Sequence, residues 1–243
     1  GASGFPVLSE LYARWRKPSR WTIHTRLTVW GSVGLTIVGS LAFLIFEWTN
    51  ANTLQSQDLS SKLITAFEAG IMPRSGGLAS FDWSAVTGPT QNLASIMMFI
   101  GGGSASTAGG IKITTFLLLG YVILAELRGD QEVRIGVRSV GAATIRTALS
   151  IALIAVALVG GSAMMLMIVS DASYADVLFE VCSAFGTVGL STGLTANLGV
   201  AGELILIVLM FIGRVGTVTA ASTFLLRRKQ QRFQLPEERP IIG

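Results

Sequence analysis

The segment at residues 175–195, ADVLFEVCSAFGTVGLSTGLT, decides how this chain folds. Residues 175–185 form a short apolar stretch that suits a helix, but a helix of that length is too short to cross a hydrocarbon core of roughly 30 Å. A run of small residues follows it, Thr187-Val188-Gly189-Leu190. Non-helical backbone at membrane depth persists only against protein or water. The segment therefore predicts a half-helix that enters a membrane, turns within it and leaves on the same side.

The composition of the whole chain supports a membrane setting. Of 243 residues, 51% are apolar and only 13% are charged, about half the charged share of an ordinary soluble domain, which is roughly 25%. Two charge-free stretches, residues 27–46 and 147–170, are each long enough as helices to span a bilayer. The single Cys182 and single His24 exclude a disulfide framework and a zinc cluster. We expect an all-α integral membrane protein.

The basic residues predict the orientation of these spans. Of the 18 Lys and Arg, 14 fall in three segments, residues 14–26, 128–146 and 227–239, which the positive-inside rule places in the cytoplasm. The loops at residues 48–61 and 170–176 contain acidic residues but no basic ones, so we expect them outside. The net charge of +4 is therefore a topology signal, and no nucleic-acid partner is expected.

The chain contains an internal repeat. A shift of 112 residues aligns Phe67-Glu68 with Phe179-Glu180 and Gly77-Leu78 with Gly189-Leu190, and it aligns the MFIG of residues 98–101 with that of residues 210–213. We name the two copies the first unit (residues 25–127) and the second unit (residues 144–229). Each is predicted to contain a spanning helix, an outer loop, a half-helix (residues 62–72 and 175–185), a glycine turn and a returning helix.

The glycine turns are the candidate ion-binding residues. We name them the first glycine run (Ser75, Gly76, Gly77, Leu78) and the second glycine run (Thr187, Val188, Gly189, Leu190). Glycine permits dihedral angles that turn successive carbonyls toward one axis, which is how a dehydrated potassium ion is coordinated, and the second run differs by one side chain from the start of the channel sequence TVGYG. The alternatives are helix caps in outer loops, or a tight turn without ion contact.

Three charged residues are predicted to support these runs. Glu68 and Glu180 each lie nine residues before the glycine of their run, and we expect them to brace it through hydrogen bonds rather than to touch ions. Arg74 directly precedes the first run and could pair with such a carboxylate. The alternative for Arg74 is a positive potential at the mouth that repels cations.

A second glycine-rich segment, at residues 101–110, interrupts the apolar stretch of residues 88–125. We name it the glycine loop. Ile111 separates it from the following lysine and no strand precedes it, so the spacing of a nucleotide-binding loop fails. Arg214 follows the residue that aligns with the start of the loop, and we expect it to donate to loop carbonyls, with structural pairing elsewhere as the alternative. The predicted gate comprises Gly101, Gly102, Gly103, Ser104, Gly109, Gly110, Lys112 and Arg214.

On three segments the chain resembles the Trk/Ktr/HKT superfamily of cation uptake proteins, and most closely its bacterial Ktr/Trk potassium-uptake branch. These are MPRSGGLASFDWSAVTGPTQNLASIMMFIGGGSASTAGGIKITTF at residues 72–116, SAFGTVGLSTGLT at 183–195 and PEERPIIG at 236–243. The resemblance implies four helix–pore-loop–helix repeats around one pore, of which this chain holds the third (25–127) and fourth (144–229). Residues 1–24 would then end the preceding repeat and begin a cytoplasmic linker, residues 128–143 would form a second linker, and residues 230–243 a C-terminal tail.

The same resemblance implies the function. It implies multi-pass potassium uptake at the plasma membrane by the intact protein, with an intramembrane gating loop, potassium as the substrate, sodium as an alternative ion and no enzymatic activity or cofactor. It also implies a homodimer and a cytosolic nucleotide-binding regulatory subunit. Two filter strands cannot surround an ion, so the activity belongs to the complete protein.

Two rival functions stay open at this point. One is a secondary transporter with broken helices that binds a small solute at mid-membrane, which would show paired breaks within its helices. The other is a membrane-anchored interaction module without transport, which would leave the charges of Lys112 and Arg214 unexplained.

Overall fold

The computed structural model describes residues 3–14, 16, 18–130, 132–136 and 138–226. The basic segment expected at residues 227–239, the tail expected at 230–243 and the sequence PEERPIIG therefore lie outside the described residues. The elements in chain order are α1 (Phe5–Arg14), a 3-10 helix (Pro18–Arg20), α2 (Ile23–Glu47), α3 (Leu59–Ile71), α4 (Gly88–Phe99), α5 (Ile113–Arg128), β1 (Arg134–Ile135), β2 (Arg138–Ser139), α6 (Ala142–Val169), α7 (Tyr174–Gly186), a 3-10 helix (Leu194–Asn197) and α8 (Val200–Leu226).

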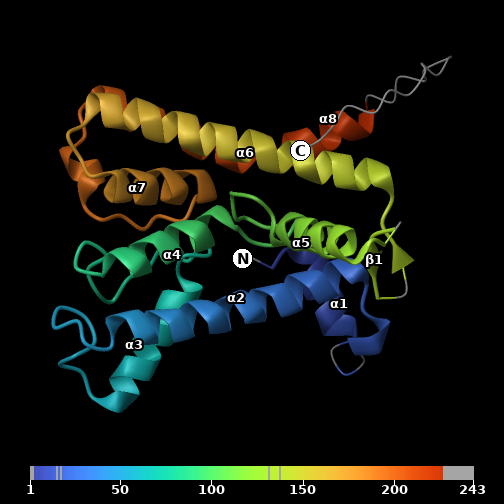
Figure 1. Ribbon diagram of the computed structural model, residues 1–243, viewed down its shortest axis with the longest axis horizontal. Coiled ribbons are helices and arrows are strands. Elements are labelled where there is room, and N and C mark those ends of the chain that lie inside the picture. Colours follow the sequence, from blue (N-terminus) through green and yellow to red (C-terminus); the bar gives the residue numbers. More distant parts are fainter. Residues whose placement is uncertain (1–2, 15, 17, 131, 137, 227–243) are drawn as a thin grey trace.

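Two long helices contain the predicted spans and run along the long axis of the molecule (Figure 1). α2 encloses residues 27–46, and α6 encloses residues 147–169, with Ser170 as its extended C-cap. Thr22 begins α2, since its side chain accepts a hydrogen bond from the backbone N–H of Thr25. Among the described helices, α2 and α6 are long and apolar enough to cross a membrane.

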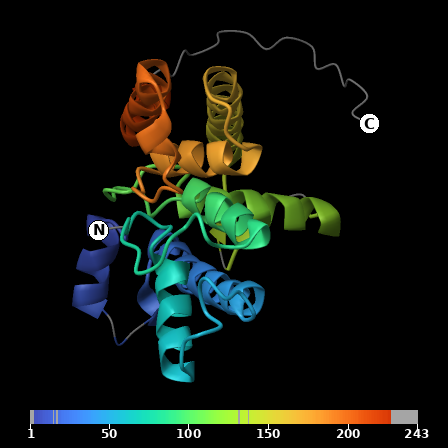
Figure 2. The ribbon, with the colours of Figure 1, turned by 90° about the vertical axis from the view of Figure 1, so that its left-hand side faces the viewer.

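The two predicted half-helices are present as α3 and α7, each of 13 residues. At 1.5 Å per residue each is about 20 Å long, less than the roughly 30 Å of a hydrocarbon core. Figure 2 shows α6 and α8 on one side with α7 next to them, α4 and α5 in the middle, and α1 to α3 on the other side. α3 packs against α2, and α7 packs against α4, α6 and α8.

The two units differ in the returning helix, which is α4 and α5 in the first unit and α8 in the second. In the first unit the chain leaves the helix after Phe99 and resumes it at Ile113, so the predicted break at residues 101–110 is present. In the second unit α8 continues without a break through Gly213, the residue aligned with Gly101. A single glycine among good helix formers lowers the stability of a helix by only about 1 kcal/mol, whereas a run of glycines favours non-helical backbone.

An aromatic cluster joins the two units. Phe81 lies 5.1 Å from Phe43 of α2 and 4.9 Å from Trp83, measured between ring centroids. Trp83 lies 5.5 Å from Phe179 of α7. Phe43, Trp83 and Phe179 are buried. Because aromatic burial contributes strongly to packing, the cluster fixes α7 of the second unit against α2 and the segment that precedes α4 in the first.

Glu47, at the end of α2, organises the same side of the first unit. It is fully buried, and its carboxylate accepts hydrogen bonds from the Thr87 backbone N–H at 2.8 Å and from the Asn50 amide at 2.6 Å. Three threonine hydroxyls also donate to it, those of Thr53, Thr87 and Thr90. A buried carboxylate needs such partners, and here it ties the end of α2 to the start of α4.

Candidate functional site

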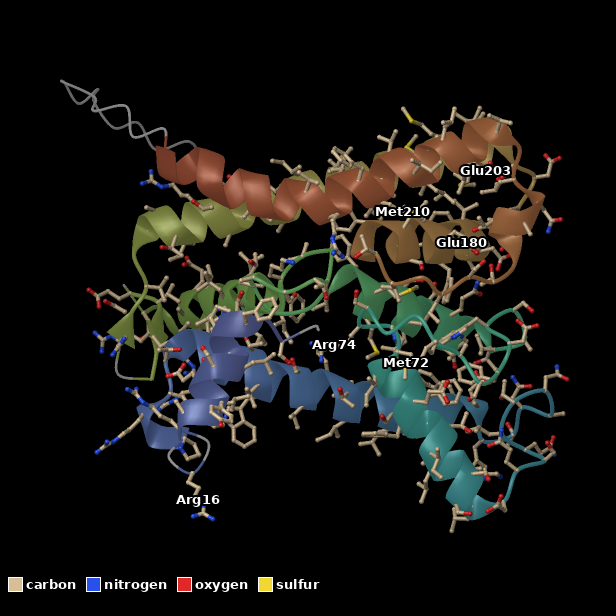
Figure 3. All side chains as sticks on the ribbon, turned by 180° about the vertical axis from the view of Figure 1, so that it is seen from behind. Arg16, Met72, Arg74, Glu180, Glu203 and Met210 are labelled. Atoms are coloured by element: carbon tan, nitrogen blue, oxygen red, sulfur yellow. The ribbon has the colours of Figure 1, made fainter. Side chains whose placement is uncertain are left out.

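The two glycine runs lie directly against each other, although 112 residues separate them. The Ser75 hydroxyl donates to the Thr187 carbonyl at 3.1 Å. A Cβ atom built on Gly77 would lie 2.3 Å from the carbonyl oxygen of Val188, which no side chain tolerates. Only glycine therefore allows the first run to approach the second this closely. Figure 3 labels Arg74, which precedes the first run, and Glu180 on α7, which precedes the second.

Both runs have the same pattern of backbone handedness. Ser75 and Gly77 have φ angles of 69° and 67°, and the aligned Thr187 and Gly189 have 50° and 97°. The residue between them in each run has negative φ. Serine and threonine adopt positive φ rarely and at a cost, so two such residues at aligned positions are an unusual feature that the two units share. Alternation of this kind can turn successive carbonyls toward one side of the strand, as a carbonyl filter requires.

The ends of the two runs differ in burial. Leu190 is 3% exposed and packs in the core with Val188, whereas Leu78 is 68% exposed. Gly76 and Gly189 are also exposed, and Gly77 is half-buried. Each run thus has an exposed glycine, and only the second run has its last residue buried by this chain.

Glu68 and Glu180 make equivalent contacts in the two units. Glu68 accepts from the backbone N–H and hydroxyl of Ser80 at 2.7 and 2.6 Å. Glu180, which is 3% exposed, accepts from the backbone N–H of Thr192, the residue aligned with Ser80, at 2.9 Å. The hydroxyls of Ser191 and Thr195 also donate to Glu180. Each carboxylate therefore holds the segment after its run against the half-helix, and the predicted bracing of the run itself stays a prediction.

Among the residues that the structure describes, Arg74 pairs with no carboxylate. Its Nη1 donates to the carbonyl oxygen of Ser32 at 3.1 Å and its Nη2 to the Ser32 hydroxyl at 2.9 Å, so it joins the first glycine run to α2. Glu68 is already occupied by Ser80, and the Arg74 side chain is 8% exposed between the run and α2. The expected acidic partner is replaced by a helix carbonyl.

The glycine loop is closed at its base by backbone hydrogen bonds. The N–H of Gly101 donates to the carbonyl of Ile111 at 2.8 Å, and the N–H of Ile113 donates to that of Gly102 at 3.0 Å. Gly103 packs against Thr28 of α2, where a Cβ would lie 2.7 Å from the Thr28 methyl carbon. Within the loop, the Ser104 hydroxyl lies 3.1 Å from that of Thr114 and the buried Lys112 ammonium donates to the carbonyl of Ala108.

The C-terminal end of the loop, next to its closed base, docks on the end of α7, beside the second glycine run. The N–H of Gly109 donates to the carbonyl of Gly186 at 3.2 Å and to the Thr187 hydroxyl at 2.9 Å, and the N–H of Gly110 donates to the carbonyl of Phe185 at 3.0 Å. Figures 1 and 2 show the α4–α5 connection next to this end of α7. The loop thereby satisfies carbonyls that a helix C-terminus leaves without partners. Sequence reasoning missed this docking, and only the density of glycine signals it.

Arg214 of α8 meets the glycine loop. Its Nη1 donates to the carbonyl of Thr107, next to the Ala108 carbonyl that Lys112 contacts. The contact expected from the repeat alignment is present, and its role in gating stays a prediction. Beside it, a Cβ on Gly213 would lie 2.1 Å from the carbonyl oxygen of Phe185, so α8 approaches α7 at the position where the loop also docks.

Comparisons with known proteins place this arrangement in a family. The family model described as TrkH, cation transport protein, matches residues 7–234. The Ktr system potassium uptake protein B of Bacillus subtilis strain 168 is 35% identical over 243 residues, which cover all of this chain and 54% of that protein. The potassium/sodium uptake protein NtpJ of Enterococcus hirae is 32% identical, over all of this chain and 55% of that protein. The chain thus spans about half the length of these relatives.

A solved structure shows the same fold. The potassium transporter TrkH from Vibrio parahaemolyticus superposes with a TM-score of 0.68 at 19% identity, over 95% of this chain and 50% of that one. The expected all-α membrane transporter fold is confirmed, and a transporter family agrees with the expectation that the chain is not an enzyme. By its family model and its relatives alike, the chain belongs to the TrkH family of cation transport proteins.

Proposed function

We propose that the complete protein takes up potassium across the plasma membrane as a multi-pass protein, and that this chain contributes two of its four repeats, residues 25–127 and 144–229. The names of the relatives support potassium as the substrate, and the potassium/sodium uptake protein of Enterococcus hirae supports sodium as a second ion. Residues 1–24, 128–143 and 230–243 would be the linkers and the tail.

The observation that carries this proposal is the meeting of the two glycine runs. They share one backbone pattern, and the Ser75 hydroxyl contacts the Thr187 carbonyl. The filter would use the backbone of Ser75, Gly76, Gly77 and Leu78 together with Thr187, Val188, Gly189 and Leu190. Carbonyls from two strands cover half of an ion, so two upstream strands would complete the ring on the exposed side of the first run.

The breaks in the helices favour a pore over a secondary transporter. A broken-helix transporter is expected to show matching breaks in its corresponding halves. Here the α4–α5 pair is broken at residues 100–112, whereas α8 is continuous through the aligned Gly213. An unpaired break between α4 and α5, whose loop contacts both α7 and α8, suits a single gate beside a filter.

The gate in this proposal is the glycine loop. Its closed base holds Gly109 against Thr187 of the second glycine run, and residues 103–108 extend beyond this base, where they could move without unfolding α4 or α5. Lys112 and Arg214 place two positive charges on consecutive loop carbonyls, which would raise the barrier for a passing cation. Opening would require these donors to release the loop.

A homodimer and a cytosolic nucleotide-binding regulatory subunit are part of the proposal on the strength of the family resemblance. The regulatory subunit would act from the side that carries the basic linkers.

The experiment is rubidium uptake by potassium-depleted bacterial cells that lack their own potassium uptake systems and express the complete protein. Saturable uptake that potassium inhibits more strongly than sodium is the expected result. If the protein reaches the membrane folded and uptake is absent, or if potassium does not compete, the proposal is wrong.

A further inference from the structure

Two adjoining crevices lie at the end of the molecule that the basic residues predict to be cytoplasmic. Their volumes are about 650 and 560 Å³, within the range of small-molecule sites. Ile23 and Leu27 of α2 and Ile135 of the β-hairpin line both crevices and separate them. No filter or gate residue described above lines either crevice.

The first crevice has the length of one bilayer leaflet. It extends along α6 from Ala143 to Ile151 and along α5 from Thr114 to Leu118. Eight residues of helix rise about 12 Å, and half of a hydrocarbon core is about 15 Å. Most of the lining residues are aliphatic, and the polar ones are His24 and four threonines, of which Thr147 donates its hydroxyl to the carbonyl of Ala143 and Thr114 contacts the Ser104 hydroxyl.

The second crevice has an interfacial lining. Trp30 and Tyr121 line it, and amphipathic aromatic residues are enriched at the level of lipid headgroups. Gly31 and Gly34 of α2 also line it. Two crevices that meet at Ile23, Leu27 and Ile135 match the two chains of one diacyl lipid better than a single compact solute.

The common mouth of the crevices is basic. Arg26 lines the second crevice. Arg138 is the cross-strand partner of Ile135, and cross-strand partners project from the same face of a hairpin, so Arg138 lies on the face that covers both crevices. Arg134 projects from the opposite face and pairs with Glu132 at 3.7 Å. Of the described residues that line the crevices, none is acidic.

We propose that these crevices form a binding site for one anionic phospholipid, with its acyl chains along α5 and α2 and its phosphate between Arg26 and Arg138. The two arginines would attract a headgroup with net negative charge, whereas they would repel the positively charged group of a zwitterionic headgroup. The site is distinct from the filter, so its test does not depend on ion selectivity.

The first test fills the hydrocarbon part of the site. A Cβ on Gly34 meets no atom within 4 Å, so Gly34→Leu occupies the second crevice without a backbone clash. Gly160→Leu is the matched control, because Gly160 is a helical glycine of α6 with equally open space and lines neither crevice. The complete protein is purified with phosphatidylglycerol or phosphatidylcholine, and native mass spectrometry counts the lipids retained. Retention of phosphatidylglycerol over phosphatidylcholine, lost in Gly34→Leu and kept in Gly160→Leu, is expected.

The second test removes the charge at the mouth. Arg138→Gln is expected to weaken phosphatidylglycerol binding about fivefold, the effect of one basic residue near an anionic surface, while Arg134→Gln leaves it unchanged. Equal retention of the two lipids by the wild type would overturn the proposal. An equal loss in both arginine variants would overturn it as well, since that result reports general surface charge rather than a site.

Discussion

The guanidinium of Arg214 on α8 donates a hydrogen bond to the carbonyl of Thr107, a residue 107 positions earlier in the glycine loop. Lys112 donates to the next carbonyl, that of Ala108. A positively charged side chain from each unit therefore contacts the glycine loop. The same loop contacts the second glycine run through Gly109 and Thr187. The contacts connect the proposed gate with the proposed filter.

Arg214→Ala is predicted to increase potassium flux. Hydrogen bonds from charged groups contribute about 1.5–3 kcal/mol, so loss of the contact with Thr107 should raise flux about tenfold if it holds the loop closed. Arg214→Lys keeps the charge but loses the planar donors and should raise flux less. Rubidium flux into vesicles containing the complete protein measures both, with Arg128→Ala at the end of α5 as a control. Unchanged flux in both Arg214 variants would show that the contact is purely structural.

Deletion of residues 102–110 is predicted to increase flux further. Gly101 and Ile111 already lie side by side next to a parallel bridge between Ile100 and Ile111, so a local rearrangement at these residues closes the shortened chain. The deletion also removes the loop contacts with Phe185 and Gly186, and a lower unfolding temperature is expected. A folded deletion variant that conducts no faster than the wild type would identify the loop as structural.

Gly213→Ala is predicted to destabilise the protein by about 1–3 kcal/mol, the usual cost of forcing an extra methyl into a packed interior. The new Cβ would lie 2.1 Å from the carbonyl oxygen of Phe185, a backbone atom that cannot move away alone. Gly160→Ala in α6 has open space and should be neutral or slightly stabilising, because alanine is the better helix former. Thermal unfolding in detergent compares the two, and equal unfolding temperatures would contradict the close packing of α8 on α7.

Glu47→Gln is predicted to destabilise the outer side of the first unit by about 2 kcal/mol, because buried donors lose their acceptor or face an amide N–H. The affected donors include the backbone N–H of Thr87 and the hydroxyl of Thr53. Glu203→Gln in the exposed first turn of α8 is the control and should cost less than about 1 kcal/mol. If Glu47→Gln lowers the free energy of unfolding no more than Glu203→Gln does, Glu47 does not organise these segments.

Much of the fold follows from local sequence patterns. Charge-free length predicts α2 and α6, short apolar stretches predict α3 and α7, and the shift of 112 residues predicts that Ser80 and Thr192 occupy equivalent places. The alignment of Gly213 with Gly101 also places Arg214 near the glycine loop.

The contacts that sequence reasoning missed join distant segments through groups without a sequence pattern. The loop docks on α7 through backbone atoms of Gly109 and Gly110, and a backbone contact leaves no side chain to recognise. Arg74 uses a helix carbonyl, that of Ser32, where charge alone suggested a carboxylate. The five donors of Glu47 come from two separate segments, the loop after α2 and the start of α4, which only the folded chain brings together.

The central claim is that the second glycine run contributes to an ion filter, and two glycines allow a matched test. Gly189 and Gly193 have φ angles of 97° and 90°, and neither would bring a Cβ closer than 3.8 Å to another residue, so serine strains both backbones alike. Only Gly189 belongs to the run. The measurement is the ratio of rubidium to sodium uptake by the complete protein. The account predicts a clear fall of this ratio in Gly189→Ser and an unchanged ratio in Gly193→Ser, and an equal ratio in the two folded variants would contradict it.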